Sequence, residues 1–351
     1  MFYDSKGTLD PHCLLDCRVV VGDCIQHQTY QCKDGAMKTL ILGSGVSGMV
    51  MGHLLKDDYL ILEKNQDLRL DTGAPFYLHE PIEWLPLQWK TVDVHEAVWD
   101  GNAFYRQPTL GMLNSFARKI TGKVIDTSLK FMDGRLKRGF FPESGNTSDI
   151  FVALHNSVKD RLQLNYEVSE IYPEEKILVA MNDNSPVNYK YDVLINTLPL
   201  PRLLSLLKKE HSFNFKADPV YIEIFKVPEE ETIEVYQVVY IANRYSDAYR
   251  ACLYNGTIYV EFMEPSKTAS ETVIEQIWGF KHCSKIFDGW LKPGKFHPVE
   301  KMRRKALLGE LTSKWNIYCL GRYAVWDYKR LEHIAQDALD IQKIIQARSQ
   351  S

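Results

Sequence analysis

Three glycines with a fixed spacing constrain the fold of this chain more than any other feature. Gly43, Gly45 and Gly48 follow the apolar run 39–42 and precede a stretch with helical spacing, 46–55. In a strand–turn–helix unit the first glycine allows the tight turn, the second lets backbone amides approach a diphosphate, and the third lets helix and strand pack closely. We therefore expect a phosphate-binding turn made of Gly43, Ser44, Gly45, Ser47 and Gly48.

An acidic residue stands where a dinucleotide-binding domain requires one. A second apolar run, 59–62, ends at Glu63, twenty residues after Gly43, and Lys64 follows. A carboxylate at this distance is placed to accept hydrogen bonds from an adenosine ribose, and it disfavours a 2′-phosphate. We predict that Glu63 and Lys64 belong to the nucleotide site. A glycine-rich turn in an α/β domain without nucleotide is the alternative.

Composition excludes several classes of protein. The chain has 351 residues, 45% hydrophobic and 25% charged, with Lys+Arg 42 against Asp+Glu 45 and a net charge of −3. The balance is too even for disorder, the length suits about two domains, and the charge indicates no large nucleic-acid footprint. No run reaches the ~18 apolar residues that a membrane span needs, and no signal peptide opens the chain. We expect a cytoplasmic protein that has no contact with a membrane.

The first 36 residues differ from the rest. Four of the seven cysteines, at positions 13, 17, 24 and 32, lie there, and the segment has no sustained period. Their spacing lacks the paired C-x2-C of common zinc sites, and nothing else indicates an oxidising compartment. We favour an extension that precedes the folded domain and predict no metal, with a zinc site and disulfides as alternatives.

Three later segments resemble one flavoprotein family. The first is Phe141-Pro-Glu-Ser-Gly145, which precedes a helix at 148–161. The second is the strand 163–171, which includes Val168. The third is the segment from Asp192 to Pro199, which contains most of the strand 191–197 and the turn after it. This order resembles the family of protoporphyrinogen oxidase, flavin amine oxidases and UDP-galactopyranose mutase. The resemblance implies FAD as the cofactor, with Val168, Thr197 and Pro199 beside it.

The C-terminal segment resembles the same family most specifically. An apolar strand, 315–320, runs into Gly321-Arg322 and then a helix at about 331–347. A turn of this kind aims backbone amides at phosphate. In the mutases, glycine, arginine, alanine and tyrosine have the spacing of Gly321, Arg322, Ala324 and Tyr328. The residues that usually follow the tyrosine in the mutases are absent.

The expected fold class is α/β, with a Rossmann-like FAD-binding domain of the two-dinucleotide-binding-domain type and an inserted α+β substrate domain. The FAD-binding domain is discontinuous (37–80, 138–207 and 301–348), and the substrate domain comprises 81–137 and 208–300. Alternating patterns at 220–226, 235–243 and 257–262 predict an antiparallel sheet there. Arg250 lies on a further strand between them. The basic cluster 301–305 is expected on the surface.

These expectations lead to three functional hypotheses. The first is an FAD-dependent oxidoreductase, resembling the amine oxidases, that oxidises a C–N bond of a small-molecule or modified-nucleobase amine by hydride transfer from the carbon to flavin N5. The second is a mutase-like enzyme acting on a sugar nucleotide without net redox change, in which Arg250, Arg322 and Tyr328 bind the diphosphate. The third is a non-catalytic flavin-binding module. The catalytic candidates are Arg250, Trp326 and Tyr328, and the aromatic residues expected to orient the substrate are Trp84, Trp89, Tyr249 and Trp326. The oligomeric state is left open.

Overall fold

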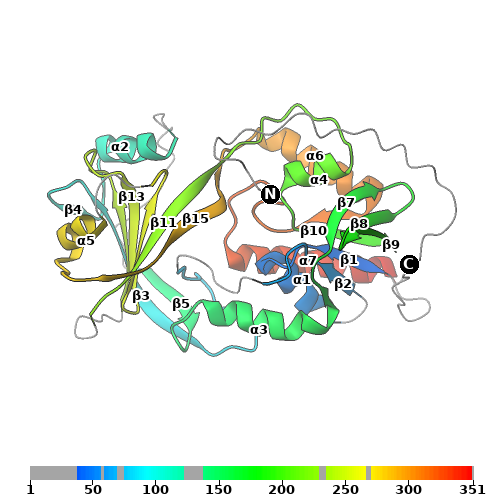
Figure 1. The fold of residues 1–351 in the computed structure, drawn as a ribbon, viewed down its shortest axis with the longest axis horizontal. Helices are drawn as coiled ribbons and strands as arrows, with labels where there is room; N and C mark the ends of the chain where they lie inside the picture. Colours follow the sequence, from blue (N-terminus) through cyan, green and yellow to red (C-terminus); the bar gives the residue numbers. More distant parts are fainter. Residues whose placement is uncertain are drawn as a thin grey trace.

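The computed structural model describes residues 38–56, 59–68, 75–121, 137–228, 235–265 and 270–349. Two bodies lie side by side, one built on a parallel sheet and the other on a large, mostly antiparallel sheet (Figure 1). The predicted N-terminal extension, with its four cysteines, lies outside the described residues, as does the segment 71–74.

The first body has the parallel sheet expected of a Rossmann-like domain. Its strand order is β16 (Ile317–Cys319), β10 (Val193–Asn196), β1 (Thr39–Leu42), β2 (Tyr59–Leu62) and β6 (Leu162–Gln163). All four pairings are parallel. The residues of β1, β2 and β10 are all buried, as expected for a sheet covered on both faces.

Alternate residues of these strands face two different helical layers. Ile41, Ile61 and Ile195 pack with helices α1 (Val46–Leu55), α3 (Ser148–Val158) and α7 (Leu331–Ser349). Leu42, Leu62 and Leu194 face the other layer, which comprises α4 (Leu200–Leu206), α6 (Lys301–Trp315) and a three-stranded sheet. That sheet consists of β7 (Glu167–Tyr172), β8 (Ile177–Asn182) and β9 (Ser185–Lys190). A short 3-10 turn, Lys159–Arg161, joins α3 to β6.

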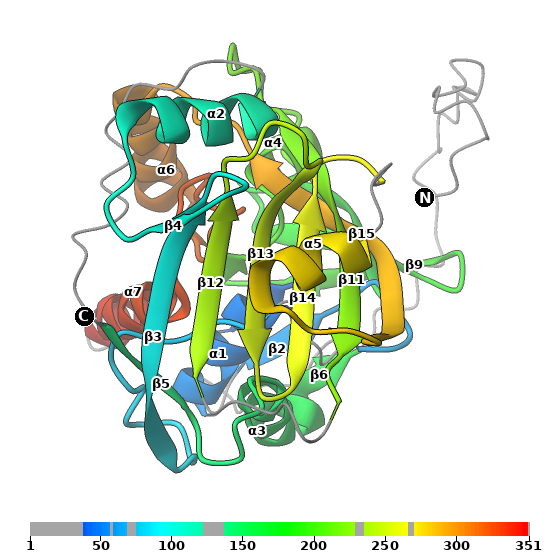
Figure 2. The ribbon, with the colours of Figure 1, turned by 90° about the vertical axis from the view of Figure 1, so that its left-hand side faces the viewer.

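The second body is an eight-stranded sheet. Its order is β15 (Ser284–Phe296), β11 (Ala217–Lys226), β14 (Thr257–Phe262), β13 (Ala248–Tyr254), β12 (Tyr236–Ile241), β3 (Trp89–Trp99) and β4 (Phe104–Tyr105), with β5 (Lys137–Pro142) also paired to β3. Helix α5 (Ser270–Trp278) lies on one face, and α2 (Leu110–Thr121) crosses near one end (Figure 2). The neighbouring strands β12 and β3 run parallel.

Two details differ from the sequence-based expectation. Residues 138–142, assigned above to the FAD-binding domain, form β5 and pair with β3 of the second sheet. The basic cluster 301–305 is not entirely a surface feature. It begins α6, and Arg304 is only 6% exposed because its guanidinium bonds the carbonyl of Trp326 and the carboxylate of Asp327.

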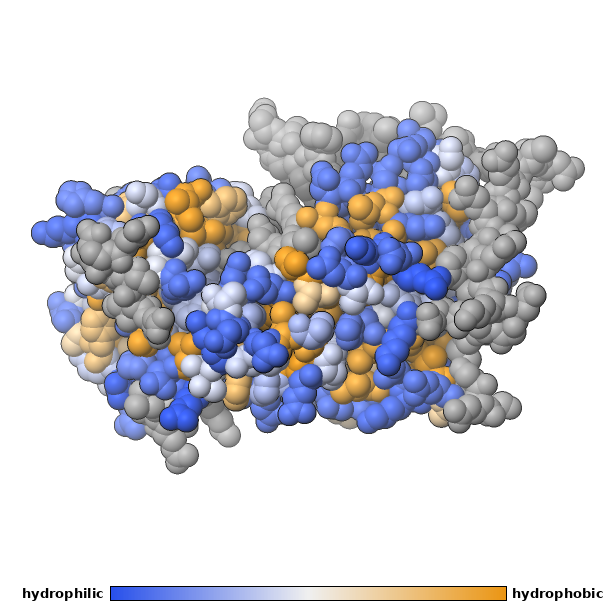
Figure 3. All heavy atoms as spheres, turned by 90° about the horizontal axis from the view of Figure 1, so that it is seen from below, coloured by the Kyte–Doolittle hydropathy of each residue, from blue (hydrophilic) through white to orange (hydrophobic). Residues whose placement is uncertain are grey.

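The surface gives no indication of a membrane span. Within the described ranges, no helix is long and apolar enough to cross a bilayer. On the face shown in Figure 3, hydrophilic residues alternate with small apolar areas.

Candidate functional site

The glycine-rich turn leaves the amino end of α1 open. Gly43 has φ +92°, a conformation that L side chains rarely adopt. A Cβ on Gly48 would stand 2.0 Å from the carbonyl oxygen of Gly43, so close packing requires glycine there. A Cβ on Gly45 would meet nothing within 4 Å, and no side chain caps the helix. The first amides of α1 therefore face open space, as an anion-binding helix terminus requires.

Glu63 is held at the end of β2 by four hydrogen bonds. One carboxylate oxygen accepts from the backbone N–H and the hydroxyl of Ser44, both at 2.9 Å. The other accepts from the backbone N–H and the side-chain amide of Asn65, at 3.0 and 2.7 Å. These donors occupy the carboxylate's four lone-pair sites. A ribose hydroxyl can bind Glu63 only by replacing the hydroxyl of Ser44 or the amide of Asn65, and Lys64 is exposed beside it.

Val168, expected near the cofactor, is buried at the start of β7. Its carbonyl oxygen accepts a hydrogen bond from the guanidinium of Arg202 at 3.1 Å. The segment that precedes it is fixed to the nucleotide strand, because Tyr166 donates its N–H to the carbonyl of Glu63 at 2.8 Å. Val168 therefore lies close to the Glu63 end of the turn, but its carbonyl already has a donor.

Thr197 and Pro199 follow β10 at the same edge of the sheet. The hydroxyl of Thr197 donates to the carbonyl of Leu42 at 2.6 Å, and a Cβ on Gly43 would approach that hydroxyl oxygen to 2.9 Å. Pro199 is the N-cap of α4. The segment after β10 thus contacts the glycine-rich turn through Thr197.

The third motif meets the same turn from the other end of the sequence. Gly321 has φ +100°, and a Cβ there would stand 2.2 Å from the hydroxyl oxygen of Ser47. A larger residue here would force Ser47 to move and would also be strained at this positive φ. Because Ser47 is in the first turn of α1, the Gly321 turn is pressed against the open helix terminus.

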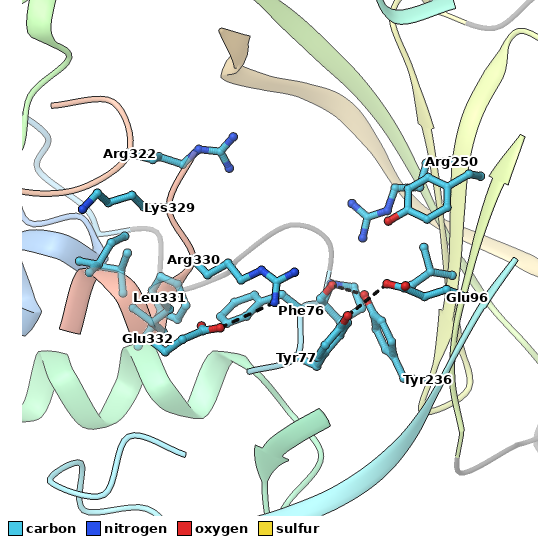
Figure 4. A pocket seen from close by; sticks show the side chains of 16 residues that line it. Phe76, Tyr77, Glu96, Tyr236, Arg250, Arg322, Lys329, Arg330, Leu331 and Glu332 are labelled. Carbon is cyan, nitrogen blue, oxygen red and sulfur yellow. Dashed lines mark hydrogen bonds and ion pairs between the residues drawn. The ribbon is translucent and has the colours of Figure 1, made fainter. Parts of the chain in front are cut away.

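A cavity of about 580 Å³ opens between the two bodies beside this junction. It reaches from the amino ends of α1 and α7 to strands β3, β12 and β13 (Figure 4). Four of its residues are cationic: Arg250, Arg322, Lys329 and Arg330. Two are acidic, Glu96 and Glu332, and the aromatic residues are Phe76, Tyr77, Phe151, Tyr236 and Tyr240. The charged lining is therefore net positive.

Three of the four cations already have a carboxylate partner. Arg250 pairs with Glu261 at 3.0 Å, Arg330 lies 3.9 Å from Glu332, and Lys329 pairs with Asp337. Arg322 pairs with no carboxylate of the described residues. It lies instead among the rings of Phe296, Tyr323 and Tyr328, at 5.2–5.6 Å from their centroids.

Three polar atoms of residues in this lining are buried without a hydrogen-bond partner. They are the Nε atoms of Arg250 and Arg322 and the Oε2 atom of Glu332. An unsatisfied buried polar group is costly, about 1–3 kcal/mol, so native structures rarely leave one without a reason. These three atoms are themselves shielded from the cavity, so its ligand-binding capacity rests on the charged groups that line it.

The expected aromatic residues are not the ones that line the cavity. Trp326 is 3% exposed in the core, and its indole N–H donates to the carbonyl of His297 at 2.9 Å. Tyr249 is fully buried, and Trp84 and Trp89 pack against the core around α1. None of the four lines the cavity, so their roles in orienting a substrate, and the catalytic role of Trp326, stay predictions from the sequence.

Tyr328 has an intermediate position. It is 59% exposed and stacks on Phe296 with ring centroids 4.5 Å apart, and its ring lies 5.6 Å from the guanidinium of Arg322. It does not line the cavity itself. Its contact with Arg322 therefore holds that side chain, which does reach the cavity.

The sequence did not single out several residues that the fold brings together. Tyr77 donates its hydroxyl to Glu96 at 3.1 Å, and Lys137 bonds the other oxygen of Glu96 at 2.7 Å. Burial and the neighbouring Glu96 raise the pKa of Tyr77, so its hydroxyl stays protonated. Burial likewise raises the pKa of Tyr240 to about 12. No sequence motif marks these positions.

The site fits an FAD and gives no indication of a metal. The open helix terminus, the Gly321 turn pressed against it and the adjoining cavity supply the kinds of contact that a dinucleotide's diphosphate and ring need. Within the part of the chain that the structure describes, no cluster of histidine, cysteine or acidic residues could hold a metal ion.

Sequence comparison finds no relative, since no protein-family model and no curated protein matches the chain. Comparison with solved structures does find proteins of similar fold. The fold is similar to that of reduced UDP-galactopyranose mutase, with a TM-score of 0.65 and 16% identity over 89% of this chain and 96% of that one.

Two further solved structures share the fold at a similar level. A fatty acid isomerase from P. acnes has a TM-score of 0.58 and 12% identity, over 88% of this chain and 98% of that one. A protoporphyrinogen oxidase-like protein from Exiguobacterium has a TM-score of 0.57 and 14% identity, over 90% and 99%. The chain therefore shares its fold with these three solved structures.

Proposed function

We infer that this protein is an FAD-dependent oxidoreductase that oxidises a C–N bond of an amine substrate bearing an anionic group, such as a carboxylate or phosphate. The observation that carries the proposal is Arg322. It is the only cation of the cavity lining without a carboxylate partner among the described residues, and its buried Nε lacks an acceptor. A planar guanidinium with free donors is suited to a carboxylate or phosphate.

Arg250 supports the same orientation from the opposite body. Its guanidinium is held by Glu261 at 3.0 Å, which fixes its direction while leaving its buried Nε without an acceptor. Arg322 from the C-terminal turn and Arg250 from β13 would hold one anionic group between the two bodies. The positive lining disfavours a simple amine, which is itself a cation at neutral pH.

Glu96 provides the complementary charge for the amino group. Each of its oxygens accepts one hydrogen bond, from Tyr77 and from Lys137, and each retains a second lone pair. Glu96 can therefore accept a hydrogen bond from a substrate ammonium and orient the C–N bond. The aromatic residues of the lining, Tyr236 and Tyr240 among them, suit either a small molecule or a modified nucleobase.

Bound FAD would supply the two-electron acceptor for the hydride. The residues that would hold it are those of the glycine-rich turn, Glu63, Thr197 and the Gly321 turn. Oxidation of the C–N bond gives an imine, and addition of water to the imine releases the free amine and a carbonyl product. The protein's contribution is to bind, orient and exclude bulk water.

The test uses the purified full chain. We expect a flavin spectrum, and loss of flavin absorbance when an amine with a carboxylate or phosphate is added without oxygen. Hydrogen peroxide on re-aeration would identify oxygen as an acceptor. The matched comparison is the same amine as its uncharged amide or ester. Equal reduction by both members of the pair would contradict the proposed anion site. A chain that takes up FAD but whose flavin no amine reduces would favour the non-catalytic flavin-binding module, and a chain unable to take up FAD would refute the proposed function.

One observation favours a second candidate, a mutase acting on a sugar nucleotide. The fold is similar to that of UDP-galactopyranose mutase, and Arg250 and Arg322 would suit a diphosphate equally well. That activity needs reduced flavin but leaves no net redox change. Conversion of a UDP-sugar only after reduction with dithionite, with no amine reducing the flavin, would decide for the mutase.

A further inference from the structure

A second, smaller cavity lies where the large sheet meets the amino end of α3, at the lower end of the sheet in Figure 2. Its volume is about 270 Å³, and it is lined by the loop between β5 and α3, the hairpin of β13 and β14, and the end of β11. Among the described residues, Pro75 alone lines both this second cavity and the first cavity, which lies between the two bodies. The proposed function assigns nothing to the second cavity.

One wall of the second cavity is a tight hairpin. Asn255 and Gly256 join β13 to β14, and both have positive φ, 49° and 66°, as a two-residue type I′ turn requires. The end of β11 holds this turn, because Lys226 pairs with Thr257 and the N–H of Val227 donates to the carbonyl of Gly256 at 2.9 Å. The hairpin thus places Asn255, Thr257 and Lys226 around the same cavity.

The other wall is the loop between β5 and α3. Gly145 has φ +77°, which glycine adopts without strain, and its N–H donates to the carbonyl of Pro142 at 2.8 Å. The side-chain oxygen of Asn146 accepts from the N–H of Ser148 at 3.0 Å, and its carbonyl accepts from the N–H of Asp149 at 3.1 Å. The first amides of α3 are therefore already bonded, and the amide nitrogen of Asn146 is the part of its side chain that stays free to donate.

Three groups that can donate hydrogen bonds converge beside Gly145. The point where a Cβ on Gly145 would lie is 3.3 Å from the hydroxyl oxygen of Tyr254, 3.4 Å from the ammonium of Lys90 and 3.5 Å from the amide nitrogen of Asn255. Tyr254 is held in this direction because its ring stacks on that of Phe141, with centroids 4.3 Å apart. Glycine has no side chain to cover these groups, so their polar ends stay accessible in this wall of the cavity.

The second cavity carries positive charge and no carboxylate. Lys226 lines it, and the ammonium of Lys90 adjoins it at Gly145. None of the described residues in the lining is acidic, and neither lysine forms an ion pair with a carboxylate of the described residues. The remaining polar groups are amides and hydroxyls. Such a set of donors suits an anion with several acceptor oxygens.

We propose that the second cavity binds a small phosphate ester of a hydroxylated molecule, such as a glycerol or sugar phosphate. Lys90 and Lys226 would hold the phosphate, and the amides of Asn146 and Asn255 and the hydroxyl of Thr257 would hold its remaining oxygens and the hydroxyl groups of the ligand. A phosphate monoester carries about two negative charges and three acceptor oxygens, which matches two ammonium groups better than a carboxylate does. The inference does not depend on the proposed function.

The size of the cavity limits the ligand. Pockets for drug-sized molecules have volumes of about 300–1,000 Å³. A cavity of about 270 Å³ is therefore suited to one phosphate group with a few hydroxylated carbons rather than to a dinucleotide.

The experiment is calorimetric titration of the FAD-loaded full chain with glycerol 3-phosphate at about pH 8, where the phosphate is fully ionised. Glycerol, which lacks the phosphate, is the matched comparison and should not bind detectably. Bound FAD fills the diphosphate site at the glycine-rich turn. The same titration on Arg322→Met removes any contribution from the anion site of the first cavity, and we expect the binding to persist there.

Three variants and a control locate the binding. Lys90→Met and Lys226→Met should each weaken it by about 10- to 150-fold, because each removes a hydrogen bond between charged groups. Thr257→Val keeps the shape of the side chain and should weaken it by about 2- to 13-fold. The control Lys190→Met removes an exposed lysine of β9 and should bind as the wild type does. Unchanged thermal unfolding of these variants would separate lost binding from lost folding.

The outcomes separate this inference from the proposed function. Binding that survives both Lys90→Met and Lys226→Met but is lost in Arg322→Met assigns the phosphate to the first cavity, which overturns the inference and supports the proposed anion site. Equal binding of glycerol and glycerol 3-phosphate, or an equal loss in Lys190→Met, also overturns it. Failure of glycerol 3-phosphate to bind overturns it as well, and leaves the proposed function to its own test, the reduction of the flavin by an amine.

Discussion

Replacing Arg322 with methionine tests the anion site most directly. The structure gives Arg322 a buried Nε without an acceptor, three aromatic rings at 5.2–5.6 Å, and no carboxylate partner among the described residues. Arg322 lines the cavity, and no carboxylate of the described residues competes with a ligand for its guanidinium. A hydrogen bond to a charged group contributes about 1.5–3 kcal/mol, which corresponds to about 10- to 150-fold in affinity.

We expect Arg322→Met to weaken binding of an anionic substrate by about 10- to 150-fold. Binding of its uncharged amide should not change. Methionine keeps apolar contact with the three rings and removes no ion pair, so the free energy of unfolding should change by less than about 1 kcal/mol. Arg322→Lys keeps the charge without the planar fork and should give an intermediate loss.

The assay is anaerobic titration of flavin absorbance with both members of the substrate pair. The matched control is Arg303→Met, because Arg303 is exposed and lies 5.3 Å from the ring of Phe213 but does not line the cavity. An equal loss for the anionic substrate and its amide would refute the reasoning. Loss of FAD from Arg322→Met would instead place this arginine on the cofactor.

Three further outcomes are expected. Gly321→Ala should lower the free energy of unfolding by about 1–3 kcal/mol in urea denaturation, since a Cβ would overlap the hydroxyl of Ser47 and φ is +100°. Adding Ser47→Gly should recover the part of this loss that comes from the steric overlap, but not the part that comes from the strained backbone conformation. Arg304→Met should lower the free energy of unfolding by about 1–3 kcal/mol, because it leaves the buried carbonyl of Trp326 without a hydrogen bond. Lys305→Met, a change at the exposed next residue, should alter the free energy of unfolding by no more than about 0.5 kcal/mol. Equal losses in the two variants would contradict the buried role of Arg304. Removing residues 1–36 should leave FAD binding and thermal stability intact and reveal no zinc; loss of folding would show that the segment is part of the domain.

The local part of the nucleotide site could be predicted from the sequence because it is continuous. A buried strand, a glycine-rich turn and a helix occupy residues 39–55, and the acidic residue follows one strand later. Such patterns depend on backbone sterics and on the period of burial, which are properties of neighbouring residues. The structure places Gly43, Gly48 and Thr197 in contacts that leave little room for larger groups.

The cavity could not be predicted in this way. Its cations come from β13 and from the segment 322–330, and Glu96 comes from β3, more than 150 residues from either. Which aromatic residues face it depends on which side of a strand is inward, and the burial pattern of β3 does not alternate cleanly. The sequence therefore suggested Trp326 and Tyr249, which pairing and packing bury elsewhere.

The sequence by itself determined a glycine-rich strand–turn–helix unit and the order of the segments that return to it. Only the tertiary structure decided that Gly321 packs on Ser47 and that Arg322 lines the cavity without a carboxylate partner in the described part of the chain. The physical reason is that backbone conformation is set by nearby residues, whereas burial and charge pairing are set by residues far apart in the chain.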